Sequence, residues 1–358
     1  MKRVRIAGAG PAGLTAAIVL ARAGRAVEVH ERSDRLGQRF RGDLHGVDNW
    51  SPEGDITDAL ARWGIERSFL FEPVETLRLS NGRRLSALRS PQPLVYLVSR
   101  GDVTAGLERG LAEQAQDLGV SLHLGSPLDA KGADIIATGA NPRHRFCVEV
   151  GIRFDTRTED LAVGLIHPEA AQGGYAYLLI HGGRGCLSVV LFGDFDRAKQ
   201  QLARARALLG ASLDLDIRNP EPIGGFGSFQ LHPDLGSHAQ PRVGEAAGLQ
   251  DFVWGFGIRR AMASGALAAQ CILEGSDYVA AARRSLAPLH RVGVINRCLW
   301  ETTAYRGFDA YVRAITRANR PLGPLRTAHT PGRIHRWLLP LACVVLSPRY
   351  APLFGRPD

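Results

Sequence analysis

The sequence predicts an α/β protein in which a parallel sheet of the nucleotide-binding type is interrupted by a β-rich insertion and followed by a helical C-terminal segment. Three observations predict this class. The chain opens with an apolar strand, a glycine-rich turn and an amphipathic helix. Residues 160–195 have the pattern of successive strands, and a second glycine-rich turn precedes a helical pattern at 257–274. The 358 residues, 45% hydrophobic and 22% charged, suit a globular chain of two or three units.

The first 31 residues predict a strand, a tight turn, a helix and a second strand. Val4 to Ala7 form the first strand, and Ala26 to Glu31 form the second. Between them, apolar residues from Leu14 to Ala21 recur at the i, i+3, i+4 and i+7 positions of one helix face. Gly24 follows where a helix C-cap is expected.

The middle of the chain predicts a hairpin, a helix and several strands. Short apolar segments flank Asn81-Gly82, a dipeptide typical of two-residue hairpin turns. A helix is expected over residues 103–116 and a buried strand over 133–139. Further strands are expected at 161–166, 175–180 and 186–192.

The glycine-rich turn at residues 8–13 has the spacing G-x-G-x-x-G, and its place between a strand and a helix is typical of dinucleotide-binding proteins. Gly8 permits the tight turn, Gly10 lets the backbone approach a pyrophosphate, and Gly13 lets the helix pack against the strand. Phosphate groups are favoured at the N-terminus of the following helix, where N–H groups are free. The predicted pyrophosphate site consists of Gly8, Gly10, Pro11, Ala12 and Gly13.

An acidic residue, Glu31, closes the second strand 23 residues after Gly8. Its carboxylate can accept hydrogen bonds from both hydroxyls of an adenosine ribose and would repel a 2′-phosphate. The site is therefore expected to reject NADP. The alternative is a glycine-rich turn of an α/β sheet that binds no ligand.

The second glycine-rich region, residues 243–265, favours FAD over NAD. A domain that binds only NAD does not need a second turn and helix start, whereas the ribityl chain and isoalloxazine of FAD extend well beyond the ADP half. A helix beginning near Gly257 would direct its positive end at the N1–C2=O edge of the flavin and favour the reduced state. Gly255, Gly257 and Ile258 are therefore predicted to contact FAD.

Residues 4–45, roughly 96–140 and 243–275 resemble three blocks of the FAD-dependent oxidoreductases that include the geranylgeranyl reductases and the aromatic-ring hydroxylases of the p-hydroxybenzoate hydroxylase type. The resemblance implies a Rossmann-type (glutathione reductase-like) FAD-binding domain with an inserted antiparallel-sheet substrate domain and a helical C-terminus. It implies an FAD-binding domain at 1–73, 97–145 and 238–280, a substrate domain at 74–96 and 146–237, and a basic helical segment at 281–358. NAD(P)H is implied as a transient electron donor.

The resemblance implies further cofactor-binding residues. Arg39 and Arg41 are similar to an arginine pair of the family, and Arg100 resembles an arginine that precedes a helix. Gly244-Glu245 resembles a glycine–aspartate motif that binds the ribityl and pyrophosphate region, with glutamate in place of aspartate. This departure, and Gly-Ala-Asn at 139–141 in place of an Asp-Gly pair, argue against ordinary hydroxylase activity. The cofactor-binding residues that the resemblance adds to those of the two glycine-rich regions are Arg32, Arg39, Arg41, Arg100, Gly139, Gly244 and Glu245.

Three residues are candidates for catalysis, although the sequence does not identify a proton donor. Residues 173–185 are similar to a geranylgeranyl reductase stretch that lines the substrate tunnel. Tyr175 and Tyr177 share one face of the expected strand, where they either form an aromatic wall beside the flavin or only pack within the sheet. His45 either reaches the flavin region or is an ordinary loop histidine. Histidine spacings typical of metal sites do not occur, so no metal is predicted.

Three functions remain open from the sequence. The first is an FAD-dependent oxidoreductase that transfers hydride to or from a carbon–carbon bond of a small lipophilic substrate, such as an isoprenoid. The second is an FAD-dependent monooxygenase that uses NAD(P)H and O₂. The third is a non-catalytic or assembly protein that has kept a flavin-binding fold.

Positive charge is concentrated in residues 291–358, which hold 11 arginines, no lysine and 3 acidic residues, against a net charge of +9 for the whole chain. A helical cap packed on the FAD domain and a peripheral contact with an anionic membrane both fit this segment. Nucleic acid is not expected as a partner, and the sequence does not indicate an oligomeric state.

No signal peptide or membrane-spanning run is recognisable, and the five cysteines form no Cys-x-x-Cys pair. We therefore expect a cytoplasmic protein, with membrane association left open.

Overall fold

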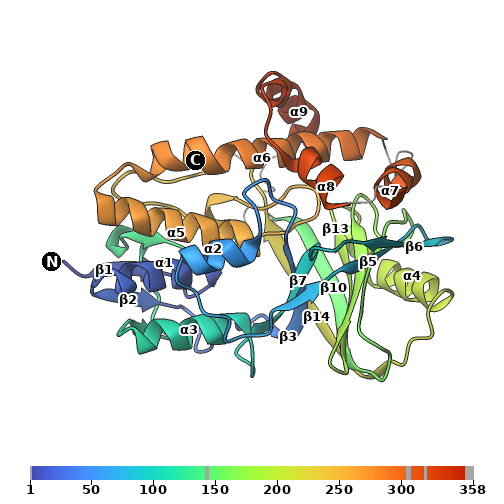
Figure 1. The fold of residues 1–358 in the computed structure, drawn as a ribbon, viewed down its shortest axis with the longest axis horizontal. Helices are drawn as coiled ribbons and strands as arrows, with labels where there is room; N and C mark the ends of the chain where they lie inside the picture. The colour runs from blue at the N-terminus through green and yellow to red at the C-terminus, as the bar shows by residue number, and fades with distance from the viewer. Residues whose placement is uncertain (1, 142–144, 304–307, 318–320, 351–358) are drawn as a thin grey trace.

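The computed structural model describes residues 2–141, 145–303, 308–317 and 321–350 (Figure 1). Helices and strands alternate in the first part of the chain, strands dominate the middle, and helices form the end. The helices are α1 (Pro11–Arg22), α2 (Ile56–Arg62), α3 (Leu107–Asp117), α4 (Ala198–Gly210), α5 (Ile258–Glu274), α6 (Tyr278–Thr303), α7 (Phe308–Arg317), α8 (Leu322–His329) and α9 (Ile334–Tyr350).

A parallel sheet carries the glycine-rich turn. Its strands lie in the order β8 (Ser121–His123), β2 (Val27–His30), β1 (Val4–Ala7) and β9 (Ile135–Ile136). Gly8 has a φ of +108°, and a Cβ on it would lie 2.2 Å from the backbone oxygen of Ala137. A Cβ on Gly13 would lie 2.0 Å from the backbone oxygen of Gly8. The roles predicted for these two glycines, a tight turn and close packing of helix on strand, are confirmed.

Helix α5 lies beside α1 and brings the second glycine-rich region to the first (Figure 1). A Cβ on Gly265 would lie 2.1 Å from the backbone oxygen of Ala12, so the two helices touch through their backbones. Gly244, with a φ of +62°, also packs on Ala12, since its Cβ would lie 2.9 Å from the Ala12 Cβ. The two glycine-rich regions are therefore held together by contacts that exclude larger side chains.

A second, seven-stranded sheet forms the right-hand part of the molecule in Figure 1. Its pairs are antiparallel except for β11 with β5. Helix α4 covers one face over an apolar core that includes Leu178, Leu187 and Val189. The order of strands is β14 (Arg218–Ser228), β10 (Arg145–Asp155), β13 (Arg184–Leu191), β12 (Tyr175–His181), β11 (Leu161–Leu165), β5 (Thr76–Ser80) and β6 (Leu85–Arg89).

A three-stranded sheet and the C-terminal helices complete the fold. The small sheet has the order β3 (Arg41–Asp48), β7 (Val95–Gly101) and β4 (Glu72–Val74). Helix α6 packs along α5, and α9 lies on α6 at the outer edge of the molecule (Figure 1). Among the helices of the described residues, none combines the length and the apolar character that crossing a membrane requires.

Most predicted elements are confirmed, and two are shorter than the sequence predicts. The helix expected over 103–116 begins at Leu107 because Ala105 has a φ of +59° and Gly106 is the N-cap. The strand expected over 133–139 keeps only Ile135–Ile136, and the chain then turns at Gly139, where φ is +74°. The predicted domain limits stay predictions, and parts of them fall on 142–144, 304–307, 318–320 and 351–358, outside the described residues.

Candidate functional site

One cavity of about 760 Å³ extends from the glycine-rich turn to the seven-stranded sheet. This volume lies within the range of roughly 300–1,000 Å³ that is typical of small-molecule and cofactor sites. Gly8, Gly13, Arg41 and Gly244 do not line it. The predicted residues that line it are Gly10, Pro11, Ala12, Glu31, Arg32, Arg39, His45, Arg100, Gly139, Tyr175, Tyr177, Glu245, Gly255, Gly257 and Ile258.

The glycine-rich turn forms a polar end of the cavity with room beside its backbone. Gly10 is the N-cap of α1, and a Cβ on it would meet no atom within 4 Å. The first N–H groups of α1 lack partners within the helix, as at any helix start. This end therefore offers an open approach to backbone donors, which suits a phosphate group.

Glu31 ties the turn to the end of β2. Its Oε2 accepts a hydrogen bond from the Ala9 N–H at 3.1 Å, and its Oε1 accepts one from the Ser33 N–H at 3.0 Å. An ionised carboxylate has about four acceptor positions, so it can still accept hydrogen bonds from ribose hydroxyls. The carboxylate is thus held in place before any ligand is bound.

Arg100 lies in a buried ion pair at the wall of the cavity. Its Nε donates to Glu108 Oε1 at 2.7 Å, and Glu108 Oε2 accepts from the Gly101 N–H at 2.7 Å. Burial opposes ionisation of Glu108, but Arg100 and the backbone N–H groups that bond to the carboxylate together outweigh it and lower the pKa of this carboxyl group. The Arg100 guanidinium carbon lies 4.2 Å from the centre of the Phe40 ring.

His45 lines the cavity beside this pair, with its Nδ1 3.5 Å from Arg100 Nη1. Burial lowers the pKa of His45 well below its ordinary value, and the charges of Arg100 and Arg39 lower it further. The imidazole is therefore neutral at physiological pH. A neutral ring can exchange hydrogen bonds with a ligand but carries no charge to offer it.

The other predicted arginines differ in their surroundings. Arg39 Nη2 lies 3.4 Å from Glu245 Oε2, and Glu245 Oε1 accepts from the Ser228 N–H at 2.9 Å. Glu245 thereby connects the cavity wall to the end of β14. Arg41 is exposed at the start of β3, where it pairs with Gly101 of β7 next to Arg100, and it does not line the cavity.

Helix α5 directs its N-terminus at the middle of the cavity. Gly257 is its N-cap, as predicted, and Gly257 and Ile258 both line the cavity. The positive end of the helix dipole therefore faces the space next to Gly255. Gly10 and Gly257, far apart in sequence, contact one continuous space.

The far end of the cavity is apolar and lies on the face of the seven-stranded sheet that α4 does not cover. Trp254 and Phe256 wall it on one side, and Ile315 of α7 and Leu325 of α8 close it. The end of the cavity at the glycine-rich turn is thus polar, and the end at the seven-stranded sheet is apolar. The aliphatic lining of this end consists of Leu77, Leu79, Leu88, Val95, Val163, Ile166, Leu179 and Val190.

Two tyrosine hydroxyls mark the boundary of the apolar end. The Tyr177 hydroxyl donates to the Glu149 carboxylate, and the Tyr175 hydroxyl donates to the backbone oxygen of Trp254. Burial raises the pKa of both tyrosines well above the ordinary value, and Glu149 raises that of Tyr177 further. Both tyrosines therefore keep their protons across the physiological pH range.

Many lining residues were not predicted from the sequence, among them Phe40, Cys147, Glu149 and Trp254. Glu149 carried a usable signal, because it is a carboxylate within the otherwise apolar run Cys147–Val150 of β10. Burial raises the pKa of Cys147 to about 12, so its thiol is protonated. The cysteines are all free, and three of them are buried.

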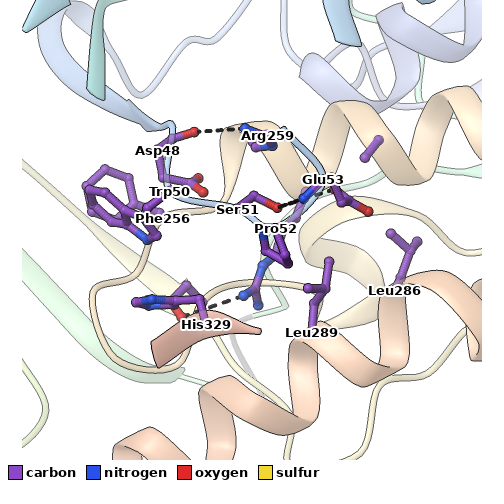
Figure 2. A pocket seen from close by; sticks show the side chains of 13 residues that line it. Asp48, Trp50, Ser51, Pro52, Glu53, Phe256, Arg259, Leu286, Leu289 and His329 are labelled. Atoms are coloured by element: carbon purple, nitrogen blue, oxygen red, sulfur yellow. Dashed lines mark hydrogen bonds and ion pairs between the residues drawn. The ribbon is translucent and has the colours of Figure 1, made fainter. Parts of the chain in front are cut away.

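A second pocket of about 20 Å³ lies behind Trp50 and Phe256, which line both pockets (Figure 2). Figure 2 shows Arg259 of α5 on one side and His329 of α8 on the other. The Arg259 Nη2 donates to the backbone oxygen of Gly54 at 2.8 Å. The pocket has room for about one water molecule, so it is a polar junction between α5 and α8 and not a cofactor site.

Comparisons with known proteins agree with the fold that surrounds this cavity. Residues 6–49 match the family model of an NAD(P)-binding Rossmann-like domain. A geranylgeranyl bacteriochlorophyll reductase-like protein from Thermoplasma acidophilum is 17% identical, with a TM-score of 0.70 over 97% of this chain and 98% of that chain. The flavin-dependent brominase Bmp2 is 14% identical, with a TM-score of 0.62 over 91% and 98% of the two chains.

A flavoprotein/dehydrogenase from Cytophaga hutchinsonii is also similar, at 15% identity and a TM-score of 0.61 over 97% of this chain and 100% of that chain. At these identities the likenesses show the fold. The chain shares the fold of these proteins: a Rossmann-like parallel core, an additional sheet whose strand pairs are mostly antiparallel, and C-terminal helices.

Proposed function

We propose that this protein is an FAD-dependent oxidoreductase that transfers hydride to or from a carbon–carbon bond of a lipophilic, isoprenoid-like substrate. The observation that carries the proposal is the single cavity that joins the glycine-rich turn, the N-terminus of α5 and an apolar sheet face. A dinucleotide with a long extension beyond its ADP half fits this layout, and FAD is such a cofactor.

The residues of the polar end would hold the ADP half. The α1 N-terminus and the space beside Gly10 suit the pyrophosphate, and Glu31 suits the ribose hydroxyls. The N-terminus of α5 at Gly257 would face the isoalloxazine, where a positive helix end favours negative charge. FAD, when bound, supplies the two-electron chemistry.

The apolar end supports a lipophilic substrate. Its lining is aliphatic and aromatic, and burying such surface favours binding by about 25 cal/mol per Å². The two tyrosine hydroxyls are bonded to protein atoms, so they place few competing polar groups in this space. A hydrocarbon chain would therefore displace water from a surface that forms few hydrogen bonds with it.

Tyr177 is the residue that we assign to proton transfer. Reduction of a carbon–carbon double bond adds a hydride to one carbon and a proton to the other. The Tyr177 hydroxyl retains its proton at the cavity wall, and the Glu149 carboxylate bonded to it connects the hydroxyl to a group that exchanges protons. In this assignment the Tyr177 O–H bond turns from Glu149 to the substrate and its proton goes to the second carbon, after which a proton taken up from water by Glu149 passes to the tyrosinate oxygen.

NAD(P)H is the electron donor that we propose, since reduction of a substrate requires an external source of two electrons. The alternative function is an FAD-dependent monooxygenase that uses NAD(P)H and O₂. It is supported by the similarity in fold to 2-methyl-3-hydroxypyridine-5-carboxylic acid oxygenase, with a TM-score of 0.54.

The test begins with the purified protein and its visible spectrum, followed by anaerobic titration with NADH and with NADPH. We expect a flavin spectrum that one of the two donors bleaches. Incubation with the donor and an isoprenoid alkene should then give a product heavier by two hydrogens per double bond. A product that gains an oxygen atom would establish the monooxygenase, and a protein that takes up no FAD would refute both functions.

A further inference from the structure

Helix α9 exposes an apolar face. Trp337 is 84% exposed, and its neighbours on this face are between 39% and 70% exposed. At about 100° per residue these positions cover an arc of about 120°, which is the width of a helix face that normally packs against another surface. The members of this apolar stripe are Ile334, Trp337, Leu338, Leu341, Val344 and Val345.

The opposite face of α9 is already buried against the protein. Ala342, Leu346 and Tyr350 pack with Val294 and Ile295 of α6. The C-terminal end of α9 is fixed as well, because the Tyr350 hydroxyl accepts a hydrogen bond at 2.8 Å from the fully buried Arg297 of α6. The helix cannot turn its apolar stripe inward without breaking these contacts.

The charge around the stripe is of one sign. Residues 310–350 contain seven arginines and no lysine, aspartate or glutamate. Arg313, Arg317, Arg333 and Arg336 have exposed side chains, and the last two lie next to the stripe at the start of α9. An apolar stripe bordered by arginines is the composition of helices that lie in the interface of an anionic membrane.

We propose that α9 docks this protein on anionic lipid surfaces, with the apolar stripe in the acyl–headgroup boundary and the arginines on lipid phosphates. The positive charge favours lipid over a second copy of the chain as the surface that covers the stripe. A second copy packed on the same face would bring two strongly basic segments together, whereas anionic lipid neutralises the arginines. The helix lies along the surface and does not span the membrane.

The docking face belongs to the part of the molecule that closes the apolar end of the cavity. Ile315 of α7 and Leu325 of α8 line that end, and both helices belong to the same C-terminal cap as α9 (Figure 1). A protein held by α9 would therefore keep the apolar end of its cavity near the lipid phase. This arrangement suits a substrate that is dissolved in the membrane.

Vesicle flotation of the full-length protein tests the proposal. We expect binding to vesicles that contain phosphatidylglycerol and weak binding to vesicles of phosphatidylcholine alone, with a blue shift of tryptophan emission on binding. The double variant Trp337→Ser/Leu341→Ser should reduce the vesicle partition coefficient by about tenfold or more, since two large apolar groups no longer enter the interface. Arg333→Gln/Arg336→Gln should weaken binding to the anionic vesicles alone.

The matched control replaces two exposed leucines outside the C-terminal helices, Leu124→Ser/Leu273→Ser, and should bind vesicles as the wild type does. Light scattering without lipid supplies the second measurement. Equal partition of the Trp337→Ser/Leu341→Ser variant and the wild type would overturn the proposal. So would a lipid-free dimer of the wild type that this variant dissociates, because the stripe would then be a contact between copies of the chain.

Discussion

At the scale of single residues, the glycines of the first turn separate ligand binding from folding. A side chain at Gly10 would enter the cavity, whereas one at Gly13 would collide with the backbone of Gly8. Gly10→Val should therefore leave the fold intact and lower FAD affinity by about tenfold or more, because the valine occupies the space proposed for the pyrophosphate. Isothermal titration with FAD and circular dichroism measure the two effects.

Gly13→Val is the comparison variant. It should reduce the soluble yield and the melting temperature of the protein even without FAD, because the valine side chain collides with the backbone of Gly8. Glu31→Ala should also weaken FAD binding, by a smaller factor, since it removes one set of ribose contacts. Wild-type FAD affinity in Gly10→Val would contradict the assignment of this end to the pyrophosphate.

The role of Tyr177 is also a prediction about one atom. Tyr177→Phe should lower kcat by about a hundredfold, a typical contribution of a general acid, with KM and the flavin spectrum little changed. Tyr175→Phe should lower kcat less, because the Tyr175 hydroxyl is bonded to a backbone oxygen and not to a carboxylate. Equal effects of the two variants on kcat would argue against a proton from Tyr177.

At the scale of elements, the contact between α1 and α5 brings the two glycine-rich regions to one cavity. Gly265→Ala places a Cβ 2.1 Å from the Ala12 backbone oxygen, so the helices must separate. We expect the free energy of unfolding to fall by about 3 kcal/mol or more, measured by urea denaturation. Gly210→Ala in α4, where a Cβ would meet no atom within 4 Å, should change it by less than about 1 kcal/mol.

Local signals decided which elements could be predicted. The turn at residues 8–13 and the Asn81-Gly82 hairpin depend on positive φ at Gly8 and Gly82, which few residues other than glycine permit, and both are confirmed. The helix start expected near Gly257 is confirmed as well. The start of α3 was wrong because Val103 and Thr104 fit a helical pattern, while the left-handed conformation of Ala105 is imposed by tertiary contacts. Nothing in a single sequence encodes such a conformation at an alanine.

At the scale of the whole molecule, the interface of α6 with the rest of the fold predicts sensitivity to acid. His290 of α6 is buried against Phe252, and burial lowers its pKa from 6.5 to about 4. Below pH 6.5 the unfolded chain therefore binds a proton that the folded protein does not, and stability is lost as the pH falls towards 4. The protonation of His290 in the unfolded chain lowers the free energy of unfolding by up to about 3 kcal/mol.

The substitution His290→Gln removes the contribution of this histidine to the loss of stability at low pH. Its unfolding free energy, measured by urea denaturation from pH 7 to pH 4, should fall less steeply than that of the wild type over the same range. His238→Gln, which replaces an exposed histidine, should follow the wild-type curve. Parallel curves for His290→Gln and the wild type would show that acid sensitivity has another origin.

The two ends of the cavity differ in how far the sequence predicted them. The polar end follows from short motifs, so Gly10, Glu31 and Gly257 were found by spacing alone. The apolar end depends on which face of the seven-stranded sheet points inward, which is set by the register of strands from distant parts of the chain. Glu149 of β10 was missed for this reason, and Trp254 was missed because it reaches the cavity from a turn outside the sheet. Arg41 does not line the cavity, and its role in cofactor binding stays a prediction.

The wall of the cavity also has a consequence for the order of assembly. Its polar end includes residues 9–12, whereas Ile315 and Leu325, which close its apolar end, are synthesised about 300 residues later. A nascent chain can form the early parallel sheet while the far end still opens into water. The apolar end of the coenzyme cavity can therefore be closed only after Leu325 has been synthesised, long after the glycine-rich turn has left the ribosome.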